Sequence, residues 1–84
     1  MRRRRRPTDE EILTAIVALA DDGFCERREL FTRLTAFGEY ELMKSIARAV
    51  RRNLVIERRA KGRTHLSLTT EGWRVYRERS VSPS

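Results

Sequence analysis

The sequence has very few of the residues that build metal centres or nucleophilic active sites. It contains one cysteine, Cys25, and one histidine, His65. A single cysteine allows no internal disulfide, and this pair cannot supply the four ligands of a structural zinc site. No serine, cysteine or aspartate stands at a catalytic-motif spacing from His65. We therefore expect no metal, no cofactor and no enzymatic activity.

Long apolar runs are also missing. The longest uncharged run inside the expected fold covers residues 12–20, whereas a membrane-spanning helix needs roughly twenty apolar residues. Met1 is followed by Arg2 to Arg6 with no apolar stretch close behind, unlike a secretory signal peptide. We expect a cytoplasmic protein. Its 84 residues, 39% of them hydrophobic, are enough for one small domain with one core.

Charge is abundant and unevenly distributed. The net charge is +7, and 17 of the 19 basic residues are arginine. Residues 1–6 carry +5, residues 7–42 carry nine acids against three bases, and residues 43–84 carry eleven bases against three acids. This separation of positive and negative charge along the chain favours a polyanionic partner, with nucleic acid as the first candidate and a membrane surface as the second. The arginine bias fits either a GC-rich genome or selection for phosphate and guanine contacts.

Three helices are expected in the first part of the chain. Thr8 to Glu11 forms a capping box, which starts a helix over 9–21 with Gly23 as its left-handed cap. A second helix over 26–35 has a core face of Leu30, Phe31 and Leu34. A third, over 39–52, begins after Gly38. Its expected core face is Leu42, Met43, Ile46, Ala49 and Val50, and its expected exposed face is Tyr40, Glu41, Lys44, Ser45, Arg48, Arg51 and Arg52.

The second part of the chain predicts a β-hairpin and a last helix. Residues 54–59 and 64–69 alternate like strands around a turn at 60–63, with Asn53 and Gly62 at left-handed positions. The residues expected to face inward are Leu54, Ile56, Leu66 and Leu68. Thr70 caps a helix over 71–79, in which Trp73 and Tyr76 belong to the core. Residues 24–25 are an extended link. The expected organisation is a basic disordered arm (1–7), a domain (8–79) and a disordered tail (80–84).

The order of elements and one run of residues resemble a known family. Residues 51–59 read RRNLVIERR, residues 61–63 read KGR, and residues 66–72 read LSLTTEG. Over residues 8–79, the chain resembles the winged helix-turn-helix domain of MarR-like and PadR-like transcriptional regulators. The resemblance implies a mostly α fold with a β-hairpin, in which three helices and the wing are followed by a C-terminal helix. It also implies sequence-specific binding of double-stranded DNA. Asn53 replaces the usual glycine, and the extra dimerising helices of these regulators are missing.

The resemblance assigns the expected DNA contacts to three places. The helix over 39–52 would enter the major groove, with Arg48 and Arg52 on guanine edges and with further contacts from Tyr40, Lys44, Ser45 and Arg51. The wing would touch the backbone or the minor groove through Arg58, Arg59, Lys61 and Arg63. The arm would offer Arg2, Arg3, Arg4, Arg5 and Arg6 to a minor groove. Each place also has an alternative interpretation. The helix face could simply be solvated, the charges of the hairpin could protect a strand edge from aggregation, and the arm could be a disordered tail that adds only non-specific affinity.

Other readings of the sequence concern partners and Cys25. The apolar face of the first helix is wider than one core needs, which favours a homodimer through Leu13, Val17 and Ala20. The acidic half, residues 7–42, leaves open a protein-interaction module within a larger complex, and an architectural or RNA-binding protein is a third option. Cys25 lies at a helix start, where a redox role is conceivable, although a buried structural cysteine is the more common case.

Overall fold

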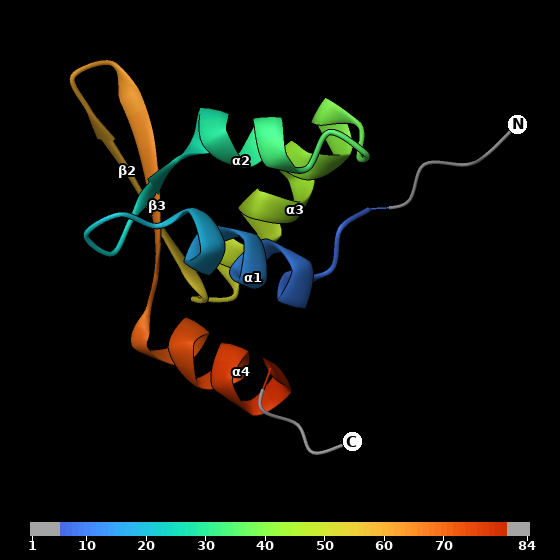
Figure 1. The fold of residues 1–84 in the computed structure, drawn as a ribbon, viewed down its shortest axis with the longest axis vertical. Coiled ribbons are helices and arrows are strands. Elements are labelled where there is room, and N and C mark those ends of the chain that lie inside the picture. The colour runs from blue at the N-terminus through green and yellow to red at the C-terminus, as the bar shows by residue number, and fades with distance from the viewer. Residues whose placement is uncertain (1–5, 81–84) are drawn as a thin grey trace, which may run out of the picture.

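The computed structural model describes residues 6–80 and shows a small α+β fold of four helices and one three-stranded antiparallel sheet. The elements are α1 (Asp9–Leu19), β1 (Cys25–Glu26), α2 (Arg27–Arg33), α3 (Glu39–Arg51), β2 (Val55–Ala60), β3 (Arg63–Leu68) and α4 (Thr70–Ser80). Figure 1 shows the β2–β3 hairpin projecting from one side of the helices and α4 lying at the end away from α2. This layout is compatible with a winged helix. Most of the predicted arm and tail, residues 1–5 and 81–84, lies outside the described residues.

The start of α1 confirms the predicted capping box, and its end differs from the prediction. The Thr8 hydroxyl accepts a hydrogen bond from the Glu11 backbone N–H at 3.1 Å, and the Thr8 N–H donates to the Glu11 carboxylate at 2.9 Å. The helix ends at Leu19, not at residue 21. Gly23 has a φ of 91° but is no helix cap. It lies in a tight turn that pairs Asp21 with Phe24 and directs the chain into the sheet.

Residues 25–26, expected to belong to an extended link and a helix start, form a short third strand. Cys25 pairs with Leu66 and Glu26 with His65, so the strand order is β1-β3-β2. Sequence periodicity could not reveal β1, because two residues are too few to show alternation. The helix α2 follows at once and spans seven residues, shorter than the predicted ten.

The hairpin confirms the predicted left-handed Gly62, shortens the turn predicted at 60–63 to two residues, and corrects the predicted register. Ala60 pairs with Arg63, and the two residues between them, Lys61 and Gly62, have φ values of 54° and 74°, as a type I′ turn requires. Asn53 is left-handed, as predicted (φ 62°). Regular pairing begins at Val55, which is buried, so the alternation places Ile56 on the outer face, where its side chain is 41% exposed.

Helix α4 is held close to the start of the wing by a glycine. Its cap is Thr69, not the predicted Thr70, because the Thr69 hydroxyl accepts from the Gly72 N–H at 2.9 Å. A Cβ on Gly72 would lie 2.1 Å from the Leu54 carbonyl oxygen, so only glycine fits this contact. As predicted, Trp73 packs against the core; its ring meets Tyr76 edge to face at 5.8 Å.

One core joins all these elements. The buried apolar side chains come from α1, β1, α2, α3, the start of the wing and β3: Ile12, Leu13, Ala15, Ile16, Cys25, Leu30, Leu42, Ile46, Ala49, Leu54, Val55, Leu66 and Leu68. Leu13 is therefore not on a dimer surface, contrary to the prediction, because the domain's own core covers it; Val17 and Ala20 are half-buried. Pro7, predicted to belong to the arm, is buried as well. The longest helix among residues 6–80 has 13 residues, and none of the helices there has the length and hydrophobicity of a membrane span.

Candidate nucleic-acid interface

The exposed face of α3 is rotated relative to the predicted one. The buried stripe is Leu42, Ser45, Ile46 and Ala49. Met43, predicted to be core, is 46% exposed, and Val50 is only half-buried. The face opposite the core is formed by Tyr40, Lys44, Ala47 and Arg51, all exposed. Of the predicted contacts on this helix, Tyr40, Lys44 and Arg51 therefore share one accessible face.

Ser45 was predicted to contact DNA, and the structure contradicts this. The residue is fully buried, and its hydroxyl has no hydrogen-bond partner among the described residues. Position 45 lies on the buried stripe of α3, where the small serine side chain is enclosed by the core. Its polarity misled the periodicity argument, which counts every serine as exposed.

Arg48 and Arg52, the predicted guanine readers, are tied to the start of α1. The Asp9 carboxylate accepts from Arg48 Nε at 3.2 Å and from Arg52 Nη1 at 2.5 Å, and Arg48 Nη2 donates to the Pro7 carbonyl at 2.9 Å. The Arg48 side chain is only 25% exposed. The expectation that Arg48 is exposed is therefore wrong: its guanidinium is used to dock α1 on α3. Arg52 stays accessible beyond its ion pair.

A third arginine is neutralised on the same edge of α3. Arg6 Nε lies 2.8 Å from a Glu41 carboxylate oxygen. Together with the Asp9 pairs, this contact gives each guanidinium group along that edge an acidic partner. Arg2, Arg3, Arg4 and Arg5 lie outside the described residues. The edge formed by Glu41, Arg48 and Arg52 is thus partly compensated, with two carboxylates facing three guanidinium groups, whereas Lys44, on the face centred on Lys44 and Ala47, has no acidic partner among the described residues.

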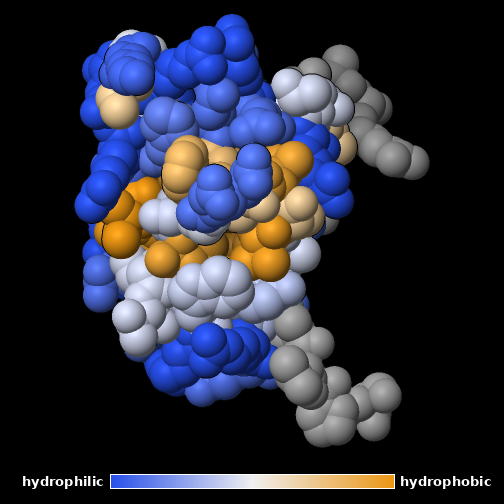
Figure 2. Space-filling view, turned by 60° about the vertical axis from the view of Figure 1, so that its left-hand side comes forward, coloured by the Kyte–Doolittle hydropathy of each residue, from blue (hydrophilic) through white to orange (hydrophobic). Residues whose placement is uncertain are grey.

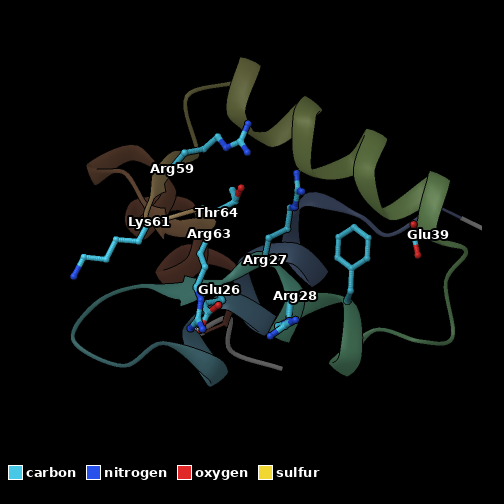
Figure 3. A pocket seen from close by; sticks show the side chains of 10 residues that line it. Glu26, Arg27, Arg28, Glu39, Arg59, Lys61, Arg63 and Thr64 are labelled. Carbon is cyan, nitrogen blue, oxygen red and sulfur yellow. Dashed lines mark hydrogen bonds and ion pairs between the residues drawn. The ribbon is translucent and has the colours of Figure 1, made fainter.

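A groove of about 530 Å³ separates the β2–β3 hairpin from α2 and the start of α3. We call it the cationic groove. Figure 3 shows Arg59 reaching from β2 toward α3, Lys61 pointing away into solvent, and Arg27 rising from α2. Its lining includes Glu26, Arg27, Arg28, Phe31, Glu39, Arg59, Lys61 and Arg63. The sequence reading missed Arg27 and Arg28, although two adjacent arginines at the start of the second helix were a visible signal.

The basic residues of the wing do not act as one group. Arg58 lies on the outer face of the sheet opposite His65, whereas Arg59 points into the cationic groove. Arg63 lies 3.3 Å from Glu26, and Arg27 lies 3.9 Å from Glu57. Arg59 and Lys61 form no ion pair with any residue in 6–80. Of the four DNA contacts predicted on the hairpin, Arg59 and Lys61 are therefore the two that line the groove and whose positive charge has no acidic partner within residues 6–80.

The two remaining candidates, Cys25 and His65, are packed against neighbouring side chains of the fold. Burial, helped by the nearby Glu29 carboxylate, raises the pKa of the Cys25 thiol to about 11, so the group stays protonated and is a poor nucleophile. His65 lies on the outer face of the sheet, where it is half-buried and meets the Phe24 ring edge to face at 5.0 Å. Within the described part of the chain, no three histidine, cysteine or acidic side chains are grouped to hold a metal ion.

Comparisons with known proteins do not assign this chain to a family or a function. No family model matches the sequence, and neither the curated proteins nor the solved structures gave a match. The charge and shape of the face formed by α3 and the cationic groove therefore carry the functional argument.

Proposed function

We propose that this protein binds double-stranded DNA in a sequence-specific manner, as a small transcriptional regulator that acts by occupying an operator. One observation carries the proposal: apart from Arg33, Arg58, Arg77 and Arg79, the cations without an acidic partner among the described residues gather around α3 and the groove. They are Lys44 and Arg51 on α3, Arg59 and Lys61 on the wing, and Arg28 on α2. Arginines on the other edge of α3 already have acidic partners, which compensate two of their three charges.

The exposed face of α3 has the form that a major groove accepts. Tyr40, Lys44, Ala47 and Arg51 follow the spacing i, i+4, i+7, i+11, which aligns them along one side of a helix. The Lys44 ammonium lies 5.0 Å from the centre of the Tyr40 ring, a cation–π contact that orients it. Ala47 leaves room for a base edge to approach. Arg51 takes the guanine-reading role that the sequence had suggested for Arg48.

The cationic groove suits the phosphate backbone beside that major groove. Arg59 and Lys61 supply charge from the wing, and Arg28 supplies it from α2. Phosphate contacts of this kind fix the position of a protein on DNA without reading its sequence. Glu39 also lines the groove and repels phosphate, which favours a backbone path nearer to Lys61 and Arg28.

The first experiment measures duplex binding by fluorescence anisotropy across a salt series. The parent should bind random duplex DNA tightly at low salt, and log K should fall steeply as log salt rises. Arg59→Ala and Lys61→Ala should each reduce the slope by about one unit. The control is Arg79→Ala, which removes the same charge from α4, at the other end of the fold. It should leave the slope almost unchanged.

A second measurement separates base reading from charge. On a site selected from random sequences, Arg51→Ala should cost ~1–3 kcal/mol and relax the preference at one or two positions. Arg48→Ala should act mainly on folding stability. The proposal fails if the parent does not bind duplex DNA at low salt, which would favour the protein-interaction module. It also fails if single-stranded or duplex RNA binds more tightly than duplex DNA.

A further inference from the structure

The outer face of the sheet, away from the cationic groove, carries apolar surface. Phe24, at the end of the α1–β1 turn, is 44% exposed, and Ile56, on β2, is 41% exposed. Figure 2 looks toward the side that bears the hairpin and this turn, and shows an apolar band between hydrophilic surface above and below. Large apolar side chains exposed together on a small domain mark an interaction surface more often than single exposed residues do.

The surface is concave and has a defined lining. A hollow of about 440 Å³ lies over the outer face, and its apolar lining includes Phe24, Ile56 and Ala60. His65 supports the Phe24 ring through their edge-to-face contact at 5.0 Å. We call these four residues the outer sheet patch. It shares no residue with the lining of the cationic groove, so both surfaces can be occupied at once.

Opposite charges flank the outer sheet patch. Asp22 lines the hollow from the α1–β1 turn, and Arg58 lines it from β2. Because β3 lies between β1 and β2, these two side chains enter from opposite sides of the sheet. Both residues are exposed, and neither has an ion-pair partner among residues 6–80. The patch therefore has an apolar centre, an acid on one side and a base on the other.

We propose that the outer sheet patch binds a second copy of this chain in a two-fold symmetric dimer. A two-fold interface must be self-complementary, because each surface meets itself after a half turn. That rotation places Asp22 of one copy against Arg58 of the second copy, and the reverse, while the two apolar centres meet. An acidic protein segment would satisfy Arg58 but would leave Asp22 facing like charge, so a second copy fits better.

The dimer leaves the proposed DNA surface free and does not depend on it. Only the outer sheet patch and its two flanking charges are covered, so α3 and the groove stay accessible in both copies. With few apolar anchors the interface is small, and we expect association near ~100 µM, weaker than for a standard-sized interface. The inference is tested without DNA, so its failure is distinguishable from a failure of DNA binding.

The test uses charge reversal and sedimentation equilibrium. Asp22→Lys and Arg58→Asp each place like charges at both flanking contacts, and each should weaken self-association by at least ~10-fold. Mixed in equal amounts, the two variants should associate again, because a dimer with one of each restores both pairs. Lysine tolerates the backbone at position 22, where φ is 56°, since Lys61 already adopts a φ of 54° in this chain.

Matched controls carry the same charge changes just outside the patch. Asp21→Lys lies one residue away in the turn, and Arg59→Asp lies on the opposite face of β2. Both should associate like the parent, and circular dichroism should show all variants folded. A parent that stays monomeric at ~1 mM, single variants that dimerise like the parent, or a mixture that fails to recover would each overturn the proposal. A monomeric parent would assign the patch to a different partner.

Discussion

Replacing Asp9 by asparagine tests the contact that docks α1 on α3. The Asp9 carboxylate is 18% exposed and holds Arg48 at 3.2 Å and Arg52 at 2.5 Å. The asparagine side chain would keep the shape of the aspartate but remove the charge shared by both arginines. Arg48, three-quarters buried, would keep only the Pro7 carbonyl as a full partner for its guanidinium. We expect the domain to stay folded but to lose stability.

The size of the loss follows from the burial of each contact. A hydrogen bond to a charged group in a partly buried site contributes about 1.5–3 kcal/mol, which applies to Arg48. The Arg52 side chain is 61% exposed, so solvent screening limits its pair to about 0.2–1 kcal/mol. Loss of an acid in the first helical turn adds about 0.3–1 kcal/mol. We expect a total near 2–3 kcal/mol, since these contributions overlap.

Urea denaturation followed by circular dichroism measures this loss. With a slope of about 1 kcal/mol per molar urea for a domain of this size, the midpoint should fall by about 2 M. The control is Glu10→Gln, which removes an acid from the same helical turn, where Glu10 pairs with no arginine in 6–80. It should lose only the helix-dipole contribution. Equal losses in both variants would refute the docking role of Asp9.

If the protein binds DNA as proposed, Asp9→Asn has a second effect of opposite direction. It releases Arg48 and Arg52, which flank the exposed face of α3, so they can reach phosphates. The salt slope of binding to random duplex DNA should then steepen by about one to two units. An unchanged slope, together with the expected loss of stability, would show that this edge of α3 lies away from the DNA.

Three further changes test the packing. Gly72→Ala places a Cβ 2.1 Å from the Leu54 carbonyl oxygen, and should cost about 3 kcal/mol in urea melts. Ser45→Ala removes a buried hydroxyl without a partner among the described residues and should raise stability by about 1 kcal/mol, whereas a loss would imply a hydrogen bond. Burial raises the pKa of Cys25 from 9.0 to about 11, so the folded state holds its proton more tightly. Stability should fall between pH 9 and pH 11, and Cys25→Ala should remove that dependence.

The sequence predicted the features that are set by neighbouring residues. The capping box at Thr8, the left-handed Asn53 and the left-handed Gly62 in the hairpin turn each depend on local backbone preferences, and all are confirmed. The order of the four helices and the hairpin is confirmed as well. Features that depend on distant pairing were missed. Strand β1 exists only because β3 lies beside it, and no local pattern indicates a two-residue strand.

The candidate site was harder to predict because polarity does not determine burial on α3. Periodicity treats Ser45 as exposed and Met43 as buried, and both assignments are wrong. The buried stripe of α3 is rotated about the helix axis relative to the predicted one, and this rotation is enough to bury Ser45 and expose Met43. The true face is set by the tertiary packing of α3, which buries Ser45 and leaves Met43 exposed.

Charge on this protein is informative only after ion pairing is taken into account. The sequence presents Arg48, Arg51 and Arg52 as equivalent, since all are arginines near the end of one helix. Asp9, which distinguishes them, lies 39 residues or more earlier in the chain. It pairs with both arginines on its side, compensating one of their two charges, and leaves Arg51 without an acidic partner among residues 6–80. For a chain so rich in arginine, the placement of its acids therefore decides which basic side chains stay unpaired, and on α3 these are Lys44 and Arg51, the residues to which the proposed function assigns the contact with DNA.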